Sequence, residues 1–416
     1  MWRYQDTIQP QLLHGNLSGN TSNTSDGTLS GNTSGTLDDT LSGNTSDTSD
    51  GTLSGNTSGT LDYTLSGNTS DTSDMKDTSQ LQQQLFDACQ HGTFDDIKNM
   101  VNIDVNFRGW GGQTALFYCC ISRVSPVDKI QFLVSHQADI NARDGFNNTI
   151  LHRACEFGTL STVRHLVDDL HMDVNTTGFR NQTPLIYCCA SSVSPVDKIQ
   201  YLVSHQADIN ALTSINNTNL HLACNYGTLS TVEYLVDDLH MNVHTTGYNN
   251  QTPLFYCCIS RVRPVDKIKY LVRHQADINA RDSYNNTNLH LACNYGTLST
   301  VEYLVDDLHM NVHTTGYNNQ TPLFYCCISR VRPVDKIKYL VRHQADINAR
   351  DSYNNTILHL ACWFGTLSSV QYLVDCLHLD LHVKNKYGKT LLGYCRMSDT
   401  EQDEKIKYIT DQMNNS

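Results

Sequence analysis

The chain has 416 residues and a formal net charge of −13, and 17% of its residues are charged. It shows no run of 18 or more apolar residues, and no basic, apolar-cored leader follows Met1, which excludes a recognisable membrane span or secretion signal. We therefore expect an intracellular protein without membrane contacts, in the cytoplasm rather than the nucleus. Fifteen cysteines in such a chain are expected to remain free thiols.

Residues 1–78 form a segment of their own. They hold two basic against ten acidic residues, and LSGNTS recurs there with a period of twelve. Each repeat has one or two leucines among Gly, Asn, Thr, Ser and Asp, so no apolar face exists to offset the entropy of ordering. This composition predicts a disordered tail that acts as a spacer or as a segment for phosphorylation. A thin β-solenoid is the alternative, and the Asn-Thr-Ser triplets match the N-glycosylation sequon.

A second repeat, of 69 residues, begins at Gln113. Within each copy a weaker copy starts 35 residues later, so units of 35 and 34 residues alternate. Marker threonines open the units at Thr114, Thr149, Thr183, Thr218, Thr252, Thr287, Thr321, Thr356 and Thr390. Helical periodicity occurs twice per unit, as in PLFYCC and VDKIKYLV. One helix pair cannot bury its apolar face alone, which predicts stacked all-α units.

Residue types at the expected helix starts support this reading. Thr252 followed by Pro253 is typical of an N-cap with proline at the first helical position. Ser125 before Pro126, and Thr297, are expected to begin second helices in the same way.

The unit pattern is similar to that of the ankyrin-repeat family. TNLHLACNYG at 287–296 and QADINARD at 275–282 carry the resemblance, which extends over about residues 80–416. It implies an all-α ankyrin-repeat solenoid with β-hairpin-like loops over 79–416, as a monomeric array. We expect a first unit at 79–112, eight full units over 113–388 and a closing unit at 389–416. Gln275 replaces a glycine of the family pattern, at a position where a positive φ is expected.

Adjacent cysteine pairs such as Cys257 and Cys258 could be metal ligands, disulfide partners or packing residues. Neighbouring residues point about 100° apart on a helix, and no CxxC or HxxxH spacing accompanies them. The resemblance places them where the family has two alanines, so we expect packing and assign no metal and no cofactor. Histidines of the LHLAC stretch, such as His290, match the family's structural histidine, which bridges loops by hydrogen bonds.

Charges alternate between units. Residues 251–285 hold six basic residues, including Lys267. The charged residues among the following 34 are all acidic. Aligned second helices predict the surface pairs Lys269–Glu302 and Arg273–Asp306, worth about 0 to 1 kcal/mol each. Basic stripes interrupted in this way do not favour nucleic-acid binding. The arginines of the longer inter-helix loops have no acidic counterpart in the shorter loops and are candidates for an acidic partner: Arg261, Arg263, Arg330 and Arg332.

The resemblance implies that partners bind at the finger tips and on the exposed side of the inner helix. The tips carry large apolar residues: Trp110, Phe146, Phe179, Ile215, Tyr248, Tyr284, Tyr317, Tyr353 and Tyr387. The inner-helix position carries Tyr118, Tyr187, Tyr256 and Tyr325 in one unit type, and Arg153, Leu222, Leu291 and Leu360 in the other. Such rows suit a protein or an extended peptide. The alternative is that tip rings lie only against adjacent fingers.

No catalytic constellation is recognisable: there is no phosphate-binding glycine loop, no nucleophile elbow and no unexplained carboxylate pair. We expect a non-enzymatic scaffold or adaptor with a protein partner. The alternatives are a subunit that brings an enzyme to its substrate, a surface glycoprotein and a nucleic-acid binder. Residues 216–287 recur letter for letter at 285–356, which suggests added reach and avidity.

Overall fold

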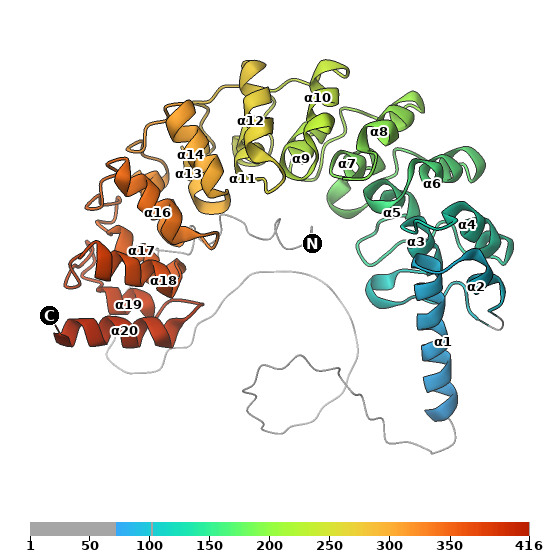
Figure 1. Cartoon of the computed structure of the whole chain (residues 1–416), viewed down its shortest axis with the longest axis horizontal. Coiled ribbons are helices and arrows are strands. Elements are labelled where there is room, and N and C mark those ends of the chain that lie inside the picture. The colour runs from blue at the N-terminus through green and yellow to red at the C-terminus, as the bar shows by residue number, and fades with distance from the viewer. Residues whose placement is uncertain (1–71, 101–102, 416) are drawn as a thin grey trace, which may run out of the picture. The chain divides into compact units, whose positions relative to one another are not determined.

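The computed structural model describes residues 72–100 and 103–415. It places pairs of antiparallel helices one after another from residue 73 to the C-terminal end (Figure 1). The expected disordered tail lies outside the described residues up to position 71. Residues 72–78, which the sequence prediction assigned to the tail, form the first turns of helix α1 instead.

Each unit contributes an inner and an outer helix. The inner helices are α1 (Thr72–Gln90), α3 (Ala115–Cys120), α5 (Ile150–Phe157), α7 (Pro184–Cys189), α9 (Asn219–Tyr226), α11 (Pro253–Ile259), α13 (Asn288–Tyr295), α15 (Pro322–Ile328), α17 (Ile357–Phe364) and α19 (Leu391–Cys395). The outer helices are α2 (Phe94–Lys98), α4 (Pro126–Ser135), α6 (Leu160–Arg164), α8 (Pro195–Ser204), α10 (Leu229–Asp237), α12 (Pro264–Arg273), α14 (Leu298–Glu302), α16 (Pro333–Arg342), α18 (Leu367–Gln371) and α20 (Gln402–Asn415).

The predicted helix starts are confirmed, but the expected capping side chains do not all bond their helix. Thr252 is the N-cap residue of α11 with Pro253 in the first turn, and its side chain makes no capping hydrogen bond. The Thr297 side chain accepts a hydrogen bond from the Thr300 amide. Ser125 precedes α4 as expected, but its backbone is left-handed (φ 42°) and its side chain caps nothing. Pro126, with its fixed φ and missing amide, is therefore the stronger helix-starting signal there.

Inner helices pack on inner helices along the array, as α11 does on α9 and α13. The apolar side chains in this contact are fully buried; in α11 these are Leu254, Phe255, Cys257 and Cys258. Full burial of a leucine or phenylalanine contributes about 1.5 to 3 kcal/mol. The all-α prediction is confirmed. Over residues 72–100 and 103–415 the single strand-like feature is an isolated bridge between Lys384 and Thr390.

Two departures from the family pattern are accommodated locally. Gln275 has a φ of 64°, and its equivalents in the other long units also lie in the left-handed region, as expected at the end of the outer helix. In three of the four short units the extra residue coincides with a π-helical turn, in which the backbone pairs i with i+5; the fourth has the continuous helix α10 instead. These turns are η4 (His165–Asp169), η7 (Tyr303–Asp307) and η9 (Tyr372–Cys376).

A buried lysine joins each long unit to the unit before it. The Lys267 ammonium donates to the carbonyls of Cys224 (2.6 Å) and Gly227 (3.2 Å) and to the Ser260 hydroxyl (2.9 Å). The same contacts, at the same register, surround Lys198, Lys336 and Lys405, and Lys129 makes them with Ala88, Cys89 and Ser122. Burial lowers the pKa of Lys267.

This finding corrects the sequence analysis, which counted Lys267 among the surface charges. All five lysines have no exposed surface. Their carbonyl partners lie at the C-terminal end of an inner helix, where four carbonyls lack intrahelical donors and a cation is favoured by the helix dipole. Gly227, at the end of α9, is required for this close approach, because a Cβ there would collide with the carbonyl oxygen of Cys189 and with Ala223.

Replacing Lys267 with methionine keeps the buried aliphatic chain but leaves the Cys224 and Gly227 carbonyls without their donor. We expect the free energy of unfolding to fall by about 2 to 4 kcal/mol, the cost of leaving buried polar groups unpaired. Urea unfolding of the full chain, followed by circular dichroism, measures this. The matched control is Lys269→Met, at an exposed position two residues away, where a change within about 0.5 kcal/mol is expected. Equal midpoints for both variants would contradict a structural role of the buried ammonium.

Candidate protein-binding surface

The fingertips are the turns that precede the inner helices. In long units each tip is a short 3₁₀ turn: η3 (Trp110–Gly112), η5 (Phe179–Asn181), η6 (Tyr248–Asn250) and η8 (Tyr317–Asn319). Adjacent tips are hydrogen-bonded to one another. The Ser283 amide donates to the Asn249 carbonyl (2.8 Å), and the Tyr317 amide to the Asn286 side chain (3.0 Å). These bonds hold neighbouring tips at a set distance.

Aromatic rings of neighbouring tips touch in pairs. Phe146 meets Phe179 edge to face with ring centroids 5.6 Å apart, and Tyr284 meets Tyr317 in the same way at 5.7 Å. Tyr353 and Tyr387 lie 6.1 Å apart. These rings and the side chains of Ile215 and Tyr248 are half-buried, apart from the exposed Tyr387. Thus the tip aromatics lie against adjacent fingers and also keep an accessible face.

The two ends of the tip row are the most exposed. Trp110 is 86% exposed and Tyr387 is 58% exposed. Beside Tyr387, the Lys386 ammonium lies 4.2 Å from the ring centre of Tyr353. Arg281 hydrogen-bonds within its own fingertip and to the next unit. Its guanidinium donates to the Asn285 carbonyl (2.7 Å) and to the Thr315 carbonyl (2.9 Å).

The inner-helix tyrosines are not where the sequence analysis expected them. Tyr187, Tyr256 and Tyr325 are buried, with at most 7% of their surface exposed, so the expectation of an exposed row is wrong for these three. The reason is a polar partner in the preceding unit, as when the Tyr256 hydroxyl donates to the Asn217 side chain (2.8 Å). A phenol so paired is stable inside a seam. Of the leucines of the other unit type, Leu222, Leu291 and Leu360 are buried as well.

Tyr118, in the first full unit, is half-buried and stacks on Phe86 of α1 with ring centroids 4.6 Å apart. The preceding unit carries Ser79 in the sequence at the register where later units carry an asparagine such as Asn217. The Tyr118 ring therefore lies on an aromatic neighbour, and it is the most accessible of the four inner-helix tyrosines.

Three histidines of the inner helices, His152, His221 and His290, bridge loops as expected. In His290, Nδ1 accepts a hydrogen bond from the Thr287 amide (3.1 Å), which requires Nε2 to carry the proton that is donated to the Gln320 carbonyl (3.2 Å). His152 and His221 repeat this arrangement. Burial lowers the pKa of His290 to about 4, because protonation would place a charge in the dry seam.

The predicted surface pairs Lys269–Glu302 and Arg273–Asp306 are wrong: neither forms an ion pair within the described residues. The acidic residues meet other groups from the next long unit. The His343 imidazole lies 3.1 Å from the Asp306 carboxylate. The Lys269 ammonium instead lies over the Tyr303 ring, 5.1 Å from its centre, in a cation–π contact.

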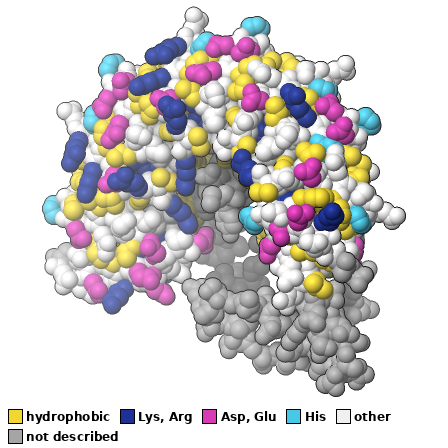
Figure 2. All heavy atoms as spheres, turned by 45° about the vertical axis from the view of Figure 1, so that its right-hand side comes forward, with side chains coloured by type: hydrophobic (Ala, Val, Ile, Leu, Met, Phe, Trp, Pro, Cys, Tyr) yellow, Lys and Arg dark blue, Asp and Glu magenta, His cyan; other side chains and the backbone are white. Residues whose placement is uncertain are grey.

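The four loop arginines are exposed. Arg263 pairs with Asp266 at 2.7 Å, and Arg332 pairs with Asp335 at 2.8 Å, each within the first turn of its own outer helix. Arg261 and Arg330 have no ion-pair partner among the described residues. Figure 2 shows lysine and arginine side chains gathered on the left, over the C-terminal half of the array.

All fifteen cysteines are free thiols, and fourteen of them are buried. Cys257 and Cys258 lie in the contact between inner helices, as the packing interpretation predicted. Burial raises the pKa of Cys258 well above its ordinary value, so the thiol stays protonated. Across residues 72–100 and 103–415, no three His, Cys, Asp or Glu side chains are grouped so that they could hold a metal ion.

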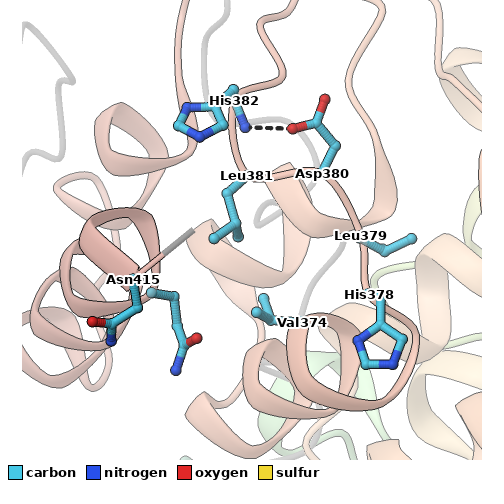
Figure 3. A pocket seen from close by; sticks show the side chains of 8 residues that line it. Val374, His378, Leu379, Asp380, Leu381, His382 and Asn415 are labelled. Atoms are coloured by element: carbon cyan, nitrogen blue, oxygen red, sulfur yellow. Dashed lines mark hydrogen bonds between the residues drawn. The ribbon is translucent and has the colours of Figure 1, made fainter.

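A shallow pocket of about 290 Å³ lies near the C-terminal end, between η9 and α20 (Figure 3). It is lined by Val374, His378, Leu379, Asp380, Leu381, His382, Gln412 and Asn415. The Asp380 carboxylate accepts a hydrogen bond from the His382 amide (2.8 Å), which stabilises the loop. The pocket therefore brings together loop-forming groups and no pair of acid and base side chains that share a proton.

None of the described helices combines the length and apolar character that a membrane crossing requires. A family model described as ankyrin repeats (three copies) matches residues 85–178, 127–213, 197–282, 220–316, 265–351, 289–386 and 332–414. The matches together run without a break from residue 85 to residue 414.

The curated proteins with related sequences include two named as ankyrin repeat proteins and one cation channel subunit. An ankyrin repeat protein of Acanthamoeba polyphaga mimivirus is 23% identical over 69% of this chain and 33% of its own length. Ankyrin repeat protein YahD of Escherichia coli (strain K12) is 24% identical over 46% of this chain and 95% of its own. The human transient receptor potential cation channel subfamily A member 1 is 24% identical over 57% of this chain and 21% of its own. Apart from YahD, the chain spans a third or less of the length of these relatives.

The buried histidines predict acid sensitivity. A histidine with a pKa of about 4 in the folded chain and about 6.5 when unfolded contributes stability that is complete above pH 6.5 and is lost as the pH falls through 4. We expect each such histidine to cost about 2 kcal/mol at pH 5. Urea midpoints at pH 7.5 and pH 5 test this. His290→Asn should reduce the difference between the urea midpoints at pH 7.5 and pH 5, and the exposed control His313→Asn should not. An equal change of midpoint with pH in both variants would contradict the assignment.

Thiol reactivity tests the burial of the cysteines. Of the fifteen, Cys376 alone is exposed, at the end of η9. We expect one thiol of the native chain to react rapidly with Ellman's reagent and fifteen to react in guanidinium chloride. Cys376→Ser should remove the rapid phase. Several fast thiols in that variant would show that the seams are open to solvent.

Proposed function

This chain belongs to the ankyrin-repeat family, and we propose that it is a non-enzymatic scaffold or adaptor that binds a protein or an extended peptide along its fingertips. Ankyrin repeats generally mediate protein–protein interactions. The observation that carries the proposal for this chain is the continuous row of large apolar tip residues, mostly aromatic, on turns that are hydrogen-bonded to one another.

Preorganisation supports binding at this row. A partner that docks on rings held by Ser283–Asn249 and Tyr317–Asn286 hydrogen bonds need not order the fingers first, so less entropy is lost on association. Half-buried rings also present a large apolar face at little side-chain entropy, which is the character of residues that dominate binding energies.

The row changes in character along the array. Phe146, Phe179 and Ile215 are purely apolar, and the tips from Tyr248 onward carry phenols. Phenol hydroxyls can exchange hydrogen bonds with the backbone of an extended ligand, so the C-terminal half suits a more polar peptide than the N-terminal half does. The repeat of residues 216–287 at 285–356 presents the same tip residues twice, which supports avidity for a partner with repeated epitopes.

Several finer statements belong to the same proposal. We assign no catalytic role, no cofactor and no nucleic acid, and we place the protein in the cytoplasm as a monomeric array. The buried Tyr187, Tyr256 and Tyr325 are no longer part of the binding surface, because their hydroxyls and rings are occupied within the seams. A subunit that brings an enzyme to a substrate is the alternative, since the tips could hold that substrate equally well.

Affinity capture with the full chain tests the fingertip surface. Tyr248, Tyr284, Tyr317 and Tyr353 are replaced together by alanine, and captured proteins are compared with those of the unchanged chain. We expect the specific partners to be lost, since a single anchor residue contributes about 2 kcal/mol or more. The matched control replaces Tyr234 and Tyr303, on the outer helical side, and should leave the partners unchanged. Circular dichroism checks folding of both variants. An unaltered set of partners for the fingertip variant would refute the proposal.

A further inference from the structure

A second surface of the array lies at the other end of the inner helices. Here the loops 260–263 and 329–332 lead from inner to outer helix; we call these two loops the arginine edge. Arg261, Arg263, Arg330 and Arg332 are exposed on it, and Val262, between two of them, is 41% exposed. The short loops that alternate with them, residues 226–229 and 295–298, hold no acidic residue.

The charge of this edge is not neutralised locally. Asp266 and Asp335 each pair with one arginine, Arg263 and Arg332 respectively. Arg261 and Arg330 have no acidic partner in the described part of the chain. The buried ammonium groups of Lys267 and Lys336 lie beneath the same loops, bonded to Ser260 and Ser329. Each loop therefore keeps an excess of positive charge.

The last seam shows what this position can hold. Its loop, residues 398–401, stands at the register of the arginine edge, with Glu401 69 residues after Arg332. The two residues share a left-handed backbone, with φ of 49° and 43°. Their side chains are opposite in charge, and the Glu401 carboxylate accepts a hydrogen bond from the Leu367 amide at the start of α18 (2.6 Å). An anionic oxygen from this loop is thus held by an amide of the neighbouring unit.

The equivalent amide, two 69-residue repeats earlier in the chain, has no hydrogen-bond acceptor among the described residues. Leu229 begins α10, a helix of nine residues, and its amide has no acceptor within the described residues. At the register of Glu401 this seam carries Arg263. A carboxylate of a bound ligand could accept a hydrogen bond from the Leu229 amide, as Glu401 does from the Leu367 amide in the last seam. It would also lie next to the arginines of the loop. Charge-assisted hydrogen bonds of this kind are about twice as strong as neutral ones.

We propose that the arginine edge is a second binding site, which takes an acidic peptide whose carboxylates fill the place that Glu401 occupies in the last seam. Because this edge and the fingertips lie at opposite ends of the inner helices, the array binds two ligands without competition between them.

The spacing of the arginines favours a peptide. Arg261 and Arg263 are two residues apart around Val262, so an extended strand can place alternate acidic side chains against them and an intervening side chain against the valine. A nucleic acid would need an unbroken row of cations, but uncharged short loops separate the two arginine loops. Exposed ion pairs are individually weak and screened by salt, so the site is expected to bind with modest, salt-sensitive affinity.

The chain supplies its own matched control. Residues 191–194 read SSVS in a loop of the same unit type, where the arginine loops read SRVR at 260–263 and 329–332. Replacing Arg261, Arg263, Arg330 and Arg332 by serine therefore converts both loops to a sequence that already folds at this register. Binding of a fluorescein-labelled decaglutamate peptide to the full chain is measured by fluorescence anisotropy at about 50 mM salt. We expect the four-serine variant to bind about tenfold or more weakly.

A reciprocal variant distinguishes loss of the binding site from loss of the fold, because it is expected to gain binding. Ser192→Arg with Ser194→Arg builds a third arginine loop at residues 191–194, and this chain should bind decaglutamate more tightly than the unchanged chain. Alanine at Tyr248, Tyr284, Tyr317 and Tyr353 should leave decaglutamate binding unaltered, so failure of the fingertip proposal can be told apart from failure of this one.

Three results would overturn the inference. The proposed site is contradicted if decaglutamate does not bind the unchanged chain, or if it binds the four-serine variant equally well. A ten-nucleotide oligothymidylate that binds as tightly, and is weakened equally by the serine substitutions, assigns the edge to polyanions in general rather than to acidic peptides.

Discussion

A buried ammonium group joins each long unit to its predecessor, and the geometry of the array depends on it. Without the Lys267 ammonium, the Cys224 and Gly227 carbonyls at the end of α9 would lose their buried donor. The other polar contact that an α12 side chain makes with the preceding unit, from the Tyr270 hydroxyl to the Glu233 carbonyl, is longer (3.5 Å) and only partly buried. The Tyr256 hydroxyl and the His221 imidazole join the same two units further along the inner helix. Short and long units are thus linked into 69-residue pairs by buried polar contacts, and such groups are stable in a dry seam only when each has its partner.

This rigidity extends to the fingertips, the proposed binding surface. The asparagine that accepts the Tyr256 hydroxyl, Asn217, also accepts the amide of the tip residue Tyr248 (2.9 Å). The interior of the seam and the fingertip therefore share one side chain. Tip rings are therefore held on turns whose position is set by the core.

The two ends of the inner helices α11 and α15 have different chemistry. The fingertips are aromatic, and their cations are engaged in bracing, as Arg281 is by two carbonyls. The two arginine loops, residues 260–263 and 329–332, are basic, and Arg261 and Arg330 have no ion-pair partner among the described residues. On the outer helices, acidic residues such as Asp306 are met by a histidine of the next unit. Acidic groups on the outer side thus have a polar partner in the next unit, whereas two arginines of the loop edge have no acidic partner among the described residues.

The amino-acid sequence by itself determined the repeat period, the helix pairs and their starts at Thr252 and Thr297, the left-handed Gln275 and the bridging role of His290, because each follows from local backbone preference or from the period. It placed large apolar residues at every tip, but it did not reveal that Tyr256 is buried while Tyr387 is exposed. It also treated Lys267 as a surface charge and paired Lys269 with Glu302. Only the tertiary structure decided these points, because the exposure of a long side chain depends on which acceptor the neighbouring unit supplies. Those acceptors, such as Asn217 and the carbonyls of Cys224 and Gly227, lie about 40 residues away in sequence and meet the side chain only when the units are stacked.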